Sequence, residues 1–226
     1  MKHLVVLTGA GVSAESGIPT FRDAGGLWEG HDVMDVATPE GWVRNPTLVL
    51  DFYNQRRKKA LEVKPNKGHL IIAELEANFK VTVITQNVDN LHERAGSTHV
   101  VHLHGTLFES RSSIDETLVY PINGWEIKVG ELCGLGSQLR PNIVWFGEPV
   151  YKMEEAIDYA SQADIFLVVG TSMQVYPAAS LIQYTSPTAR KIVVDPKRPE
   201  YFFDEVEYIE EGAGSGMEKV KSLLLN

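Results

Sequence analysis

The sequence has a single cysteine, Cys133, among 226 residues. One thiol excludes an internal disulfide and any zinc site built from several thiolates. No apolar run reaches the ~18 residues that a membrane-spanning helix needs. Basic residues are also in deficit, since 21 Lys and Arg face 30 Asp and Glu, which gives a formal net charge of −9. We therefore expect no membrane partner and no basic surface for nucleic acid.

What is present is enough for a folded core, because 43% of the residues are hydrophobic and 23% are charged. The apolar run at residues 4–7 ends at Thr8 and the glycines that follow it. A signal peptide needs an apolar region of roughly 7 to 15 residues, so we interpret this run as a buried first strand. Together with the single cysteine, that interpretation predicts a cytoplasmic location.

Short apolar runs without polar alternation are typical of parallel strands covered on both faces. Here they occupy residues 4–7, 81–85, 100–103, 165–169 and 192–194. Helical patterns lie between them, at residues 46–61, 69–77, 154–162 and 178–184. This alternation predicts an α/β fold with a doubly wound parallel sheet.

Two stretches interrupt the alternation and predict a small second domain. Residues 23–65 have mostly helical patterns and no strand signal. Residues 106–140 have a sequence pattern that differs from both the sheet domain and this helical stretch. In the second stretch Asn123-Gly124 separates two apolar runs, which predicts a hairpin, with Pro121 at an edge or bulge. We assign residues 1–22, 66–105 and 141–226 to the sheet domain, and residues 23–65 and 106–140 to the small domain.

The first predicted strand runs directly into Gly9-Ala10-Gly11. Glycines at such a turn let the backbone approach a pyrophosphate at the start of the next helix. The third glycine of the usual dinucleotide fingerprint is missing, so the motif alone is also compatible with a simple tight turn. Because no lysine follows the glycines, a phosphate-loop NTPase is excluded.

Five longer motifs give a specific resemblance. They are GAGVSAESGIPTFRDAGGLW (residues 9–28), TQNVDNLH (85–92), HLHG (102–105), RPNIVWFGE (140–148) and GTSMQVYPA (170–178). In this order they resemble the signatures of the sirtuins, the NAD-dependent protein-lysine deacylases, over nearly the whole chain. The resemblance implies a Rossmann-like NAD-binding domain and NAD as the cofactor.

The resemblance also implies roles for individual residues. Gln86 and Asn87 would contact the nicotinamide ribose, and Asp89 would hold the carboxamide with the backbone near Ile18, although Asn87 or Asp89 could instead cap a helix. Asp195, where many sirtuins carry Asn, would bind the adenosine ribose diol. The remaining expected NAD contacts are Gly9, Ala10, Gly11, Ser13, Phe21, Arg22, Trp28, Gly170, Thr171, Ser172 and Ala213, the last in a glycine-rich loop, residues 212–216, before the final helix.

His104 is the candidate catalytic histidine, with Asn87 beside it in the site. An imidazole at the ligand edge of the sheet can take a proton near neutral pH. By resemblance, His104 accepts a ribose hydroxyl proton after the acyl oxygen of the substrate has displaced nicotinamide. For His69, His92 and His99 we expect surface or packing roles.

Most sirtuins bind a structural zinc through two Cys-x-x-Cys pairs in the small domain. Aligning the flanking motifs places Ser112 and Asp115 at the first pair, and Leu132 and Leu135 at the second, with Cys133 out of register. We therefore predict no structural zinc and no other metal. We expect the two leucines either to pack where the metal would lie or to be ordinary loop residues.

The expected substrates are acylated-lysine proteins or peptides. On the helix predicted at residues 46–61, Tyr53 and Arg56 match the Tyr-x-x-Arg pair of the sirtuins that prefer succinyl, malonyl or glutaryl groups, and Ala24 resembles the small residue that widens their pocket. The alternative is that Arg56 is a surface arginine in a basic run. The peptide would lie as an added strand beside Val144, Phe146, Val175 and Tyr176.

The sequence thus predicts an NAD-dependent lysine deacylase, acting on succinyl or malonyl groups and also on acetyl groups, that releases nicotinamide and O-acyl-ADP-ribose. Two alternatives stay open. The same NAD site could serve mono-ADP-ribosyl transfer, or the protein could be an NAD-binding sensor without catalysis. His104, Asn87 and Asp89 together favour an enzyme over a sensor.

Overall fold

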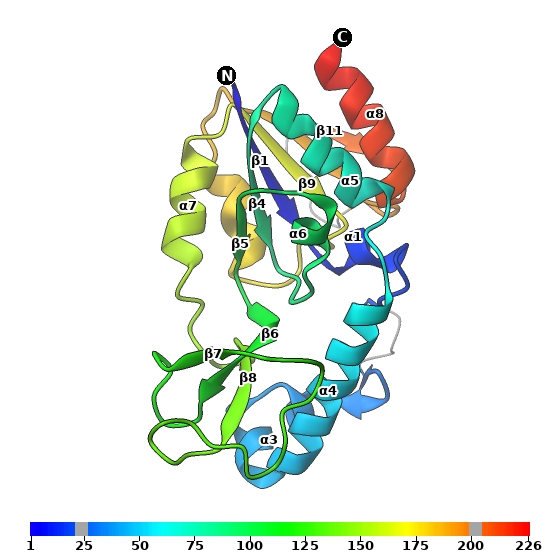
Figure 1. Ribbon diagram of the computed structural model, residues 1–226. Coiled ribbons are helices and arrows are strands. Elements are labelled where there is room, and N and C mark those ends of the chain that lie inside the picture. Colours follow the sequence, from blue (N-terminus) through cyan, green and yellow to red (C-terminus); the bar gives the residue numbers. More distant parts are fainter. Residues whose placement is uncertain (21–26, 199–204) are drawn as a thin grey trace.

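Figure 1 shows the computed structural model, which describes residues 1–20, 27–198 and 205–226. Its upper part is built on a six-stranded parallel sheet with the strand order β11-β10-β9-β1-β4-β5. The strands are β1 (His3–Thr8), β4 (Lys80–Thr85), β5 (Val100–His102), β9 (Ile165–Val169), β10 (Arg190–Val194) and β11 (Val206–Ile209). The doubly wound α/β prediction is confirmed.

Successive side chains of β1 show why its apolar run is continuous. Leu4 and Val6 pack in the core with α5 (Lys67–Glu74), the short η2 (Leu75–Ala77) and α8 (Ala213–Leu225). Val5 and Leu7 point to the other face, in the core with α7 (Met153–Ser161) and η3 (Ala178–Tyr184). Both faces are therefore covered, by α7 on the left and by α5 and α8 on the right in Figure 1.

The order of the strands locates the ligand edge. From β1 the chain passes to β4 and then β5 on one side, and later to β9, β10 and β11 on the other. Ligands of such sheets bind outside the carboxyl ends of the strands where this reversal occurs. That point lies between β1 and β9, which pair in parallel from Leu4–Ile165 to Thr8–Val169.

A second layer lies below this edge in Figure 1. It contains the antiparallel sheet β7-β6-β8, formed by β7 (Val119–Pro121), β6 (Gly105–Ser112) and β8 (Leu139–Ile143), and the helix α4 (Pro46–Glu62). The helix begins at the predicted residue, Pro46, which lies in its first turn, and Asn45 is its N-cap. Two short helices, α2 (Val33–Val36) and α3 (Pro39–Arg44), pack against α4. The residue boundaries that we assigned to the two domains stay a prediction.

The hairpin predicted across Asn123-Gly124 is wrong. β7 pairs with β6, whereas residues 125–129 form no strand. The side chain of Asn54 on α4 holds this segment instead, since its amide accepts from the backbone nitrogen of Ile127 at 2.9 Å and donates to the Ile127 carbonyl at 3.0 Å. Ile127 is also buried. Burial against α4 therefore replaces strand pairing.

The expected absence of strands in residues 23–65 is also wrong in detail. Two-residue strands, β2 (Leu27–Trp28) and β3 (His31–Asp32), form a minimal antiparallel hairpin. Glu29 and Gly30 at its turn both have positive φ, of 49° and 85°. Positive φ at both central residues is the backbone of the tight two-residue hairpin turn that Gly favours.

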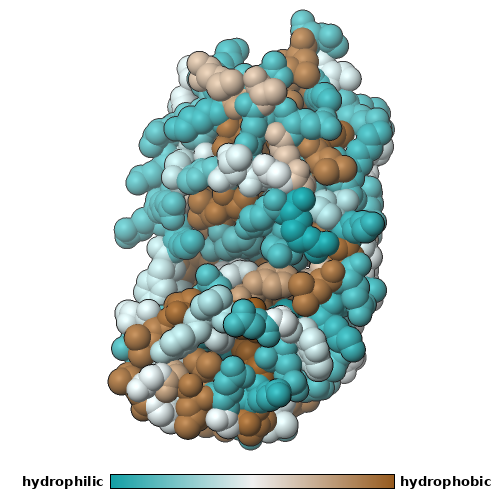
Figure 2. Space-filling model, in the orientation of Figure 1, coloured by the Kyte–Doolittle hydropathy of each residue, from teal (hydrophilic) through white to brown (hydrophobic). Residues whose placement is uncertain are grey.

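The packing prediction for Leu132 and Leu135 is wrong as well. Their exposed fractions are 56% and 58%, so the alternative of ordinary loop residues holds. Cys133 is the buried member of this segment and packs with Leu50, Ile127 and Leu139. Figure 2 accordingly shows hydrophobic surface gathered over the small domain, at the lower end of the molecule.

Across the described ranges, no helix combines the length and the hydropathy needed to cross a bilayer.

Candidate active site

A cavity of about 800 Å³ lies at the carboxyl edge of the parallel sheet and extends to α4 and β8. Phe21, Arg22 and Ala24 lie outside the described residues. Every other site residue predicted from the sequence lines this cavity. They are Gly9, Ala10, Gly11, Ser13, Ile18, Trp28, Tyr53, Arg56, Gln86, Asn87, Asp89, His104, Val144, Phe146, Gly170, Thr171, Ser172, Val175, Tyr176, Asp195 and Ala213.

The glycine turn after β1 packs main chain to main chain against the turn after β9. The Gly9 amide donates to the Val169 carbonyl at 3.1 Å, and the Gly11 amide donates to the Gly170 carbonyl at 2.8 Å. A Cβ on Gly11 would lie 2.7 Å from the Cα of Gly170, which itself has φ of +63°. The glycines therefore let two adjacent turns meet and leave bare backbone at the cavity.

Amide and carboxyl groups converge behind this turn. The Asn87 Nδ2 donates to the Gly9 carbonyl at 3.1 Å and to the Ser13 Oγ at 3.2 Å. The Ser13 hydroxyl donates to Asp89 Oδ2 at 3.0 Å. The other carboxylate oxygen of Asp89 accepts from the Leu91 amide at 3.0 Å, in the turn that leads into α6 (Leu91–Ala95), whose N-cap is Asn90. Asp89 is therefore not the N-cap of α6, but its carboxylate joins the site to the turn before that helix.

The electrostatics of Asp89 and His104 follow mainly from burial. Burial raises the pKa of Asp89, although the hydrogen bonds from Leu91 and Ser13 lower it. Burial lowers the pKa of His104, and the bond to Gln86 opposes this. The His104 Nδ1 lies 3.1 Å from the Gln86 carbonyl oxygen. A carbonyl only accepts, so Nδ1 carries the proton and Nε2 remains as the free base of a neutral imidazole.

Two further histidines stabilise this region, and the sequence assigned them no role in it. The His102 Nδ1 donates to the Asn87 carbonyl at 3.0 Å, while its Nε2 lies 2.7 Å from Glu93 Oε1. Burial lowers the pKa of His102, but Glu93 outweighs this and raises it overall. His69 is fully buried with Nε2 at 3.4 Å from the Ser13 Oγ, and burial lowers its pKa to about 4. The prediction that His69 has a packing role is compatible with this contact.

Sequence reasoning also missed Glu15 and Asn66. The Asn66 amide donates to the Val12 carbonyl at 2.7 Å and thereby ties the start of α5 to α1 (Ala10–Ala14). Glu15 accepts from the Gly214 amide at 3.1 Å. Glu15 stands inside the motif at residues 9–28 but had no assigned role, and Asn66 lies just before the helix predicted at residues 69–77.

The adenosine end of the expected site contains Asp195, which is 7% exposed at the end of β10. Its Oδ1 accepts from the Lys197 amide at 3.0 Å. The glycine-rich loop predicted before the last helix is corrected by the structure, because α8 already begins at Ala213. A Cβ at position 216 would clash with the side chain of Val194, so the glycine allows α8 to pack closely against β10.

Tyr53 and Arg56 lie on the buried face of α4 and reach the same cavity. The Trp145 indole nitrogen donates to the Tyr53 hydroxyl at 3.0 Å. The guanidinium of Arg56 stacks 4.2 Å from the ring centroid of Trp28. Its side chain is only 7% exposed, so the alternative of a surface arginine is wrong.

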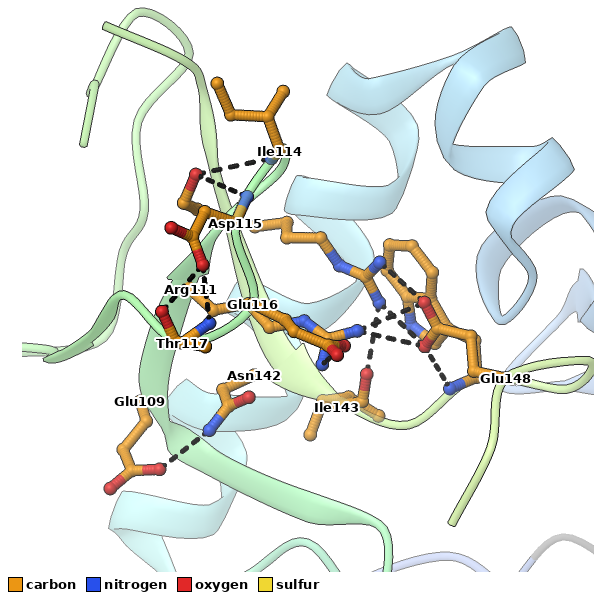
Figure 3. A network of polar contacts seen from close by, with 12 residues as sticks. Glu109, Arg111, Ile114, Asp115, Glu116, Thr117, Asn142, Ile143 and Glu148 are labelled. Atoms are coloured by element: carbon orange, nitrogen blue, oxygen red, sulfur yellow. Dashed lines mark hydrogen bonds and ion pairs between the residues drawn. The ribbon is translucent and has the colours of Figure 1, made fainter. Parts of the chain in front are cut away.

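A network of charges holds the segment that carries Val144 and Phe146 (Figure 3). Arg140 and Arg111 both bind Glu148, at distances of 2.8 and 3.1 Å between Nη and Oε1. Glu148 also accepts from the Trp145 amide at 2.9 Å. Burial raises the pKa of Glu148, but the bonds from Arg140 and Trp145 outweigh this and lower it overall. These contacts fix the turn after β8 at the edge of the cavity.

Among the residues that the structure describes, no group of three or more His, Cys, Asp or Glu side chains is arranged to hold a metal ion. At the expected zinc position, Ser112 instead accepts from the Cys133 thiol at 3.3 Å and contacts Ser137 at 3.0 Å. The zinc-free small domain stays a prediction.

A doubly wound sheet with a glycine turn at its switch point, and with amide groups and a half-buried histidine at the same carboxyl edge, defines a dinucleotide-binding class of fold and site. Comparison with known proteins identifies the family. The Sir2 family model matches residues 9–177. The chain belongs to the Sir2 family.

Close relatives are similar over their whole length. The chain is 55% identical to a protein of Bacteroides thetaiotaomicron over 100% of this chain and 99% of that one, and 53% identical to a protein of Helicobacter pylori over 100% and 98%. Both relatives are named NAD-dependent protein deacylase. A crystal structure of a Sir2 homolog–NAD complex superimposes with a TM-score of 0.89 at 38% identity, covering 99% of this chain and 89% of that chain.

Proposed function

We propose that this protein is an NAD-dependent protein-lysine deacylase that removes succinyl and malonyl groups, and also acetyl groups, from lysine side chains. The names of the relatives and the NAD complex of a structural neighbour support the deacylase activity. The observation that supports the acidic preference is the buried Arg56 beside Tyr53 in the cavity wall.

The residues present fit NAD. The bare backbone at Gly9 and Gly11 would approach the pyrophosphate, and the buried carboxylate of Asp195 would accept from ribose hydroxyls. Gln86 and Asn87 supply amides near the junction of the two layers, where the nicotinamide ribose would bind. Bound NAD would supply an electrophilic ribose carbon and nicotinamide as the leaving group.

The chain itself would supply the base. Burial lowers the pKa of His104 below its ordinary 6.5, which favours the neutral imidazole at pH 7, and with Nδ1 protonated its Nε2 carries the acceptor lone pair. It would take the proton of a ribose hydroxyl. General-base catalysis of this kind accelerates a reaction by ~10²- to 10⁴-fold. Asn87, held by Gly9 and His102, would orient the ribose.

The acyl group would bind against α4. Arg56 can donate to an acyl carboxylate and Tyr53 can donate its hydroxyl hydrogen, and such charge-assisted bonds are roughly twice as strong as neutral ones. Burial raises the pKa of Tyr53, so its hydroxyl stays protonated and remains a donor. The peptide would add as a strand between Val144 and Phe146 on one side and Val175 and Tyr176 on the other.

The test is a matched panel of acetyl-, malonyl- and succinyl-lysine peptides with NAD, followed by peptide mass. We expect higher kcat/KM for the acidic acyl groups and its loss in Arg56→Met, with acetyl turnover retained. Lys58→Met is the matched control, because Lys58 is exposed on the same helix. Acetyl preference in the wild type, unchanged by Arg56→Met, would refute the acidic-acyl part.

A further inference from the structure

The guanidinium of Arg56 already binds a carboxylate of this chain. Its Nη1 lies 2.7 Å from Glu29 Oε1, and the two side chains are 7% and 32% exposed. Glu29 and Arg56 both line the site cavity. The Nε of Arg56 is buried and has no hydrogen-bond partner within the described part of the chain. Arg56 thus has one donor occupied by Glu29 and a second donor unused.

The two ends of this ion pair differ in their freedom. Arg56 is held in place by α4 and by the rings of Trp28 and Phe52, 4.2 and 5.5 Å from its guanidinium carbon. Glu29 projects from the two-residue turn between β2 and β3, and a third of its side chain is exposed. The Glu29 carboxylate can therefore leave Arg56 and bind water instead, whereas the Arg56 guanidinium is held in the cavity wall.

We propose that Glu29 determines acyl specificity by occupying the place on Arg56 that an acyl carboxylate would take. This inference rests on the proposed function. When the acyl group is neutral, as in acetyl-lysine, Glu29 stays and compensates the buried charge of Arg56. When the acyl group is acidic, its carboxylate displaces Glu29 into solvent. One pocket can then accept both classes without an uncompensated buried charge.

The physical reason is the cost of burying an unpaired charge. One guanidinium facing one carboxylate is neutral, whereas an acidic acyl group alongside Glu29 would leave an excess negative charge. Glu29 therefore competes with acidic substrates and supports neutral ones. Removing the charge of Glu29 should raise kcat/KM for acidic acyl substrates and lower it for neutral ones.

The test is Glu29→Gln, which removes the charge and keeps the length of the side chain. We expect the ratio of kcat/KM for succinyl-lysine over acetyl-lysine peptides to rise about tenfold, the size of one charge-assisted hydrogen bond, mainly through a lower KM for the succinyl peptide. Glu62→Gln, at the exposed end of α4, is the matched control and should leave the ratio unchanged.

The Arg56→Met background separates this inference from the proposed function. If Glu29 acts on Arg56, Glu29→Gln should have no effect on the ratio there. If Arg56→Met alone leaves the ratio of the wild type unchanged, the acidic-acyl proposal itself fails. If Arg56→Met lowers the ratio but Glu29→Gln leaves it unchanged or lowers it, only the role of Glu29 is overturned. Circular dichroism melts of each variant establish that the fold is retained.

Discussion

The backbone of Gly11 contacts the backbone of Gly170, and the Gly11 amide donates to the Gly170 carbonyl at 2.8 Å. This contact joins the turn after β1 to the turn after β9. At this point the order in which the chain adds strands to the parallel sheet reverses. A methyl group on Gly11 would lie 2.7 Å from the Gly170 Cα and its carbonyl oxygen. Since both partners are backbone, neither can move aside without a cost in folding free energy.

Gly11→Ala should therefore destabilise the protein by about 1–3 kcal/mol, the usual cost of overpacking, and weaken NAD binding. Denaturant unfolding and calorimetric titration with NAD measure the two effects. Gly134→Ala is the control, because the nearest atom to its added Cβ would be the Tyr120 hydroxyl at 3.6 Å. Wild-type stability and NAD affinity in Gly11→Ala would contradict this account of the turn.

His104→Gln should lower kcat by about 10²- to 10⁴-fold, as expected for loss of a general base, while NAD still binds. In the wild type, burial lowers the pKa of His104, so the base form persists at pH 7 and kcat/KM should fall only below pH 6.5. Steady-state pH profiles measure this. His99→Gln, at an exposed position, should keep the wild-type profile. An acid limb that survives in His104→Gln would exclude His104 as its source.

Glu148→Gln should raise the KM for the peptide and destabilise the protein by about 3 kcal/mol, because it leaves Arg140 and Arg111 without their shared carboxylate. The folded-state pKa of Glu148 is lowered below its usual 4.5. Its stabilisation is therefore complete above pH 4.5 and is lost as the pH falls through the lower folded value.

Unfolding curves between pH 3 and 7 test that sign. The wild type should lose more stability than Glu148→Gln as the medium becomes acidic, while Glu155→Gln on the exposed side of α7 should follow the wild type. Parallel curves for the wild type and Glu148→Gln would show that the pair contributes no pH-dependent stability.

Treatment with a strong chelator should leave the melting temperature unchanged, and elemental analysis of the purified protein should find zinc far below one equivalent. The reason is that Ser112, Asp115, Leu132 and Leu135 lack the thiolates that a structural zinc requires. A melting temperature that drops on chelation and recovers with added zinc would contradict the zinc-free small domain.

The sequence was sufficient to predict the parallel sheet, because β1 and β9 are apolar on both faces and their residues alternate between two cores. It missed β11, an edge strand whose VEYI pattern is short and mixed. It also predicted strand pairing across Asn123-Gly124, since a turn signal does not reveal that Asn54, more than seventy residues away, binds Ile127.

The candidate site was predictable for a different reason. Its residues stand in long motifs at the ends of strands, and the sheet brings those ends together. The roles of Glu29 and His102 could not be predicted in this way. His102 stands in the HLHG motif, but its role depends on the carbonyl of Asn87, and the role of Glu29 depends on Arg56, which only the folded chain places beside it. Burial of Cys133 rather than Leu132 likewise depends on the packing of Leu50 and Leu139.

The most direct test of the central claim is product stoichiometry with NAD and a succinyl-lysine peptide. Mass spectrometry would follow the peptide and ADP-ribose species, while chromatography would follow nicotinamide. We predict equal amounts of nicotinamide, deacylated peptide and O-succinyl-ADP-ribose. Nicotinamide release with the acyl peptide intact and ADP-ribose attached to protein would instead establish ADP-ribosyl transfer, and NAD binding without any turnover on the whole acyl panel would indicate a sensor.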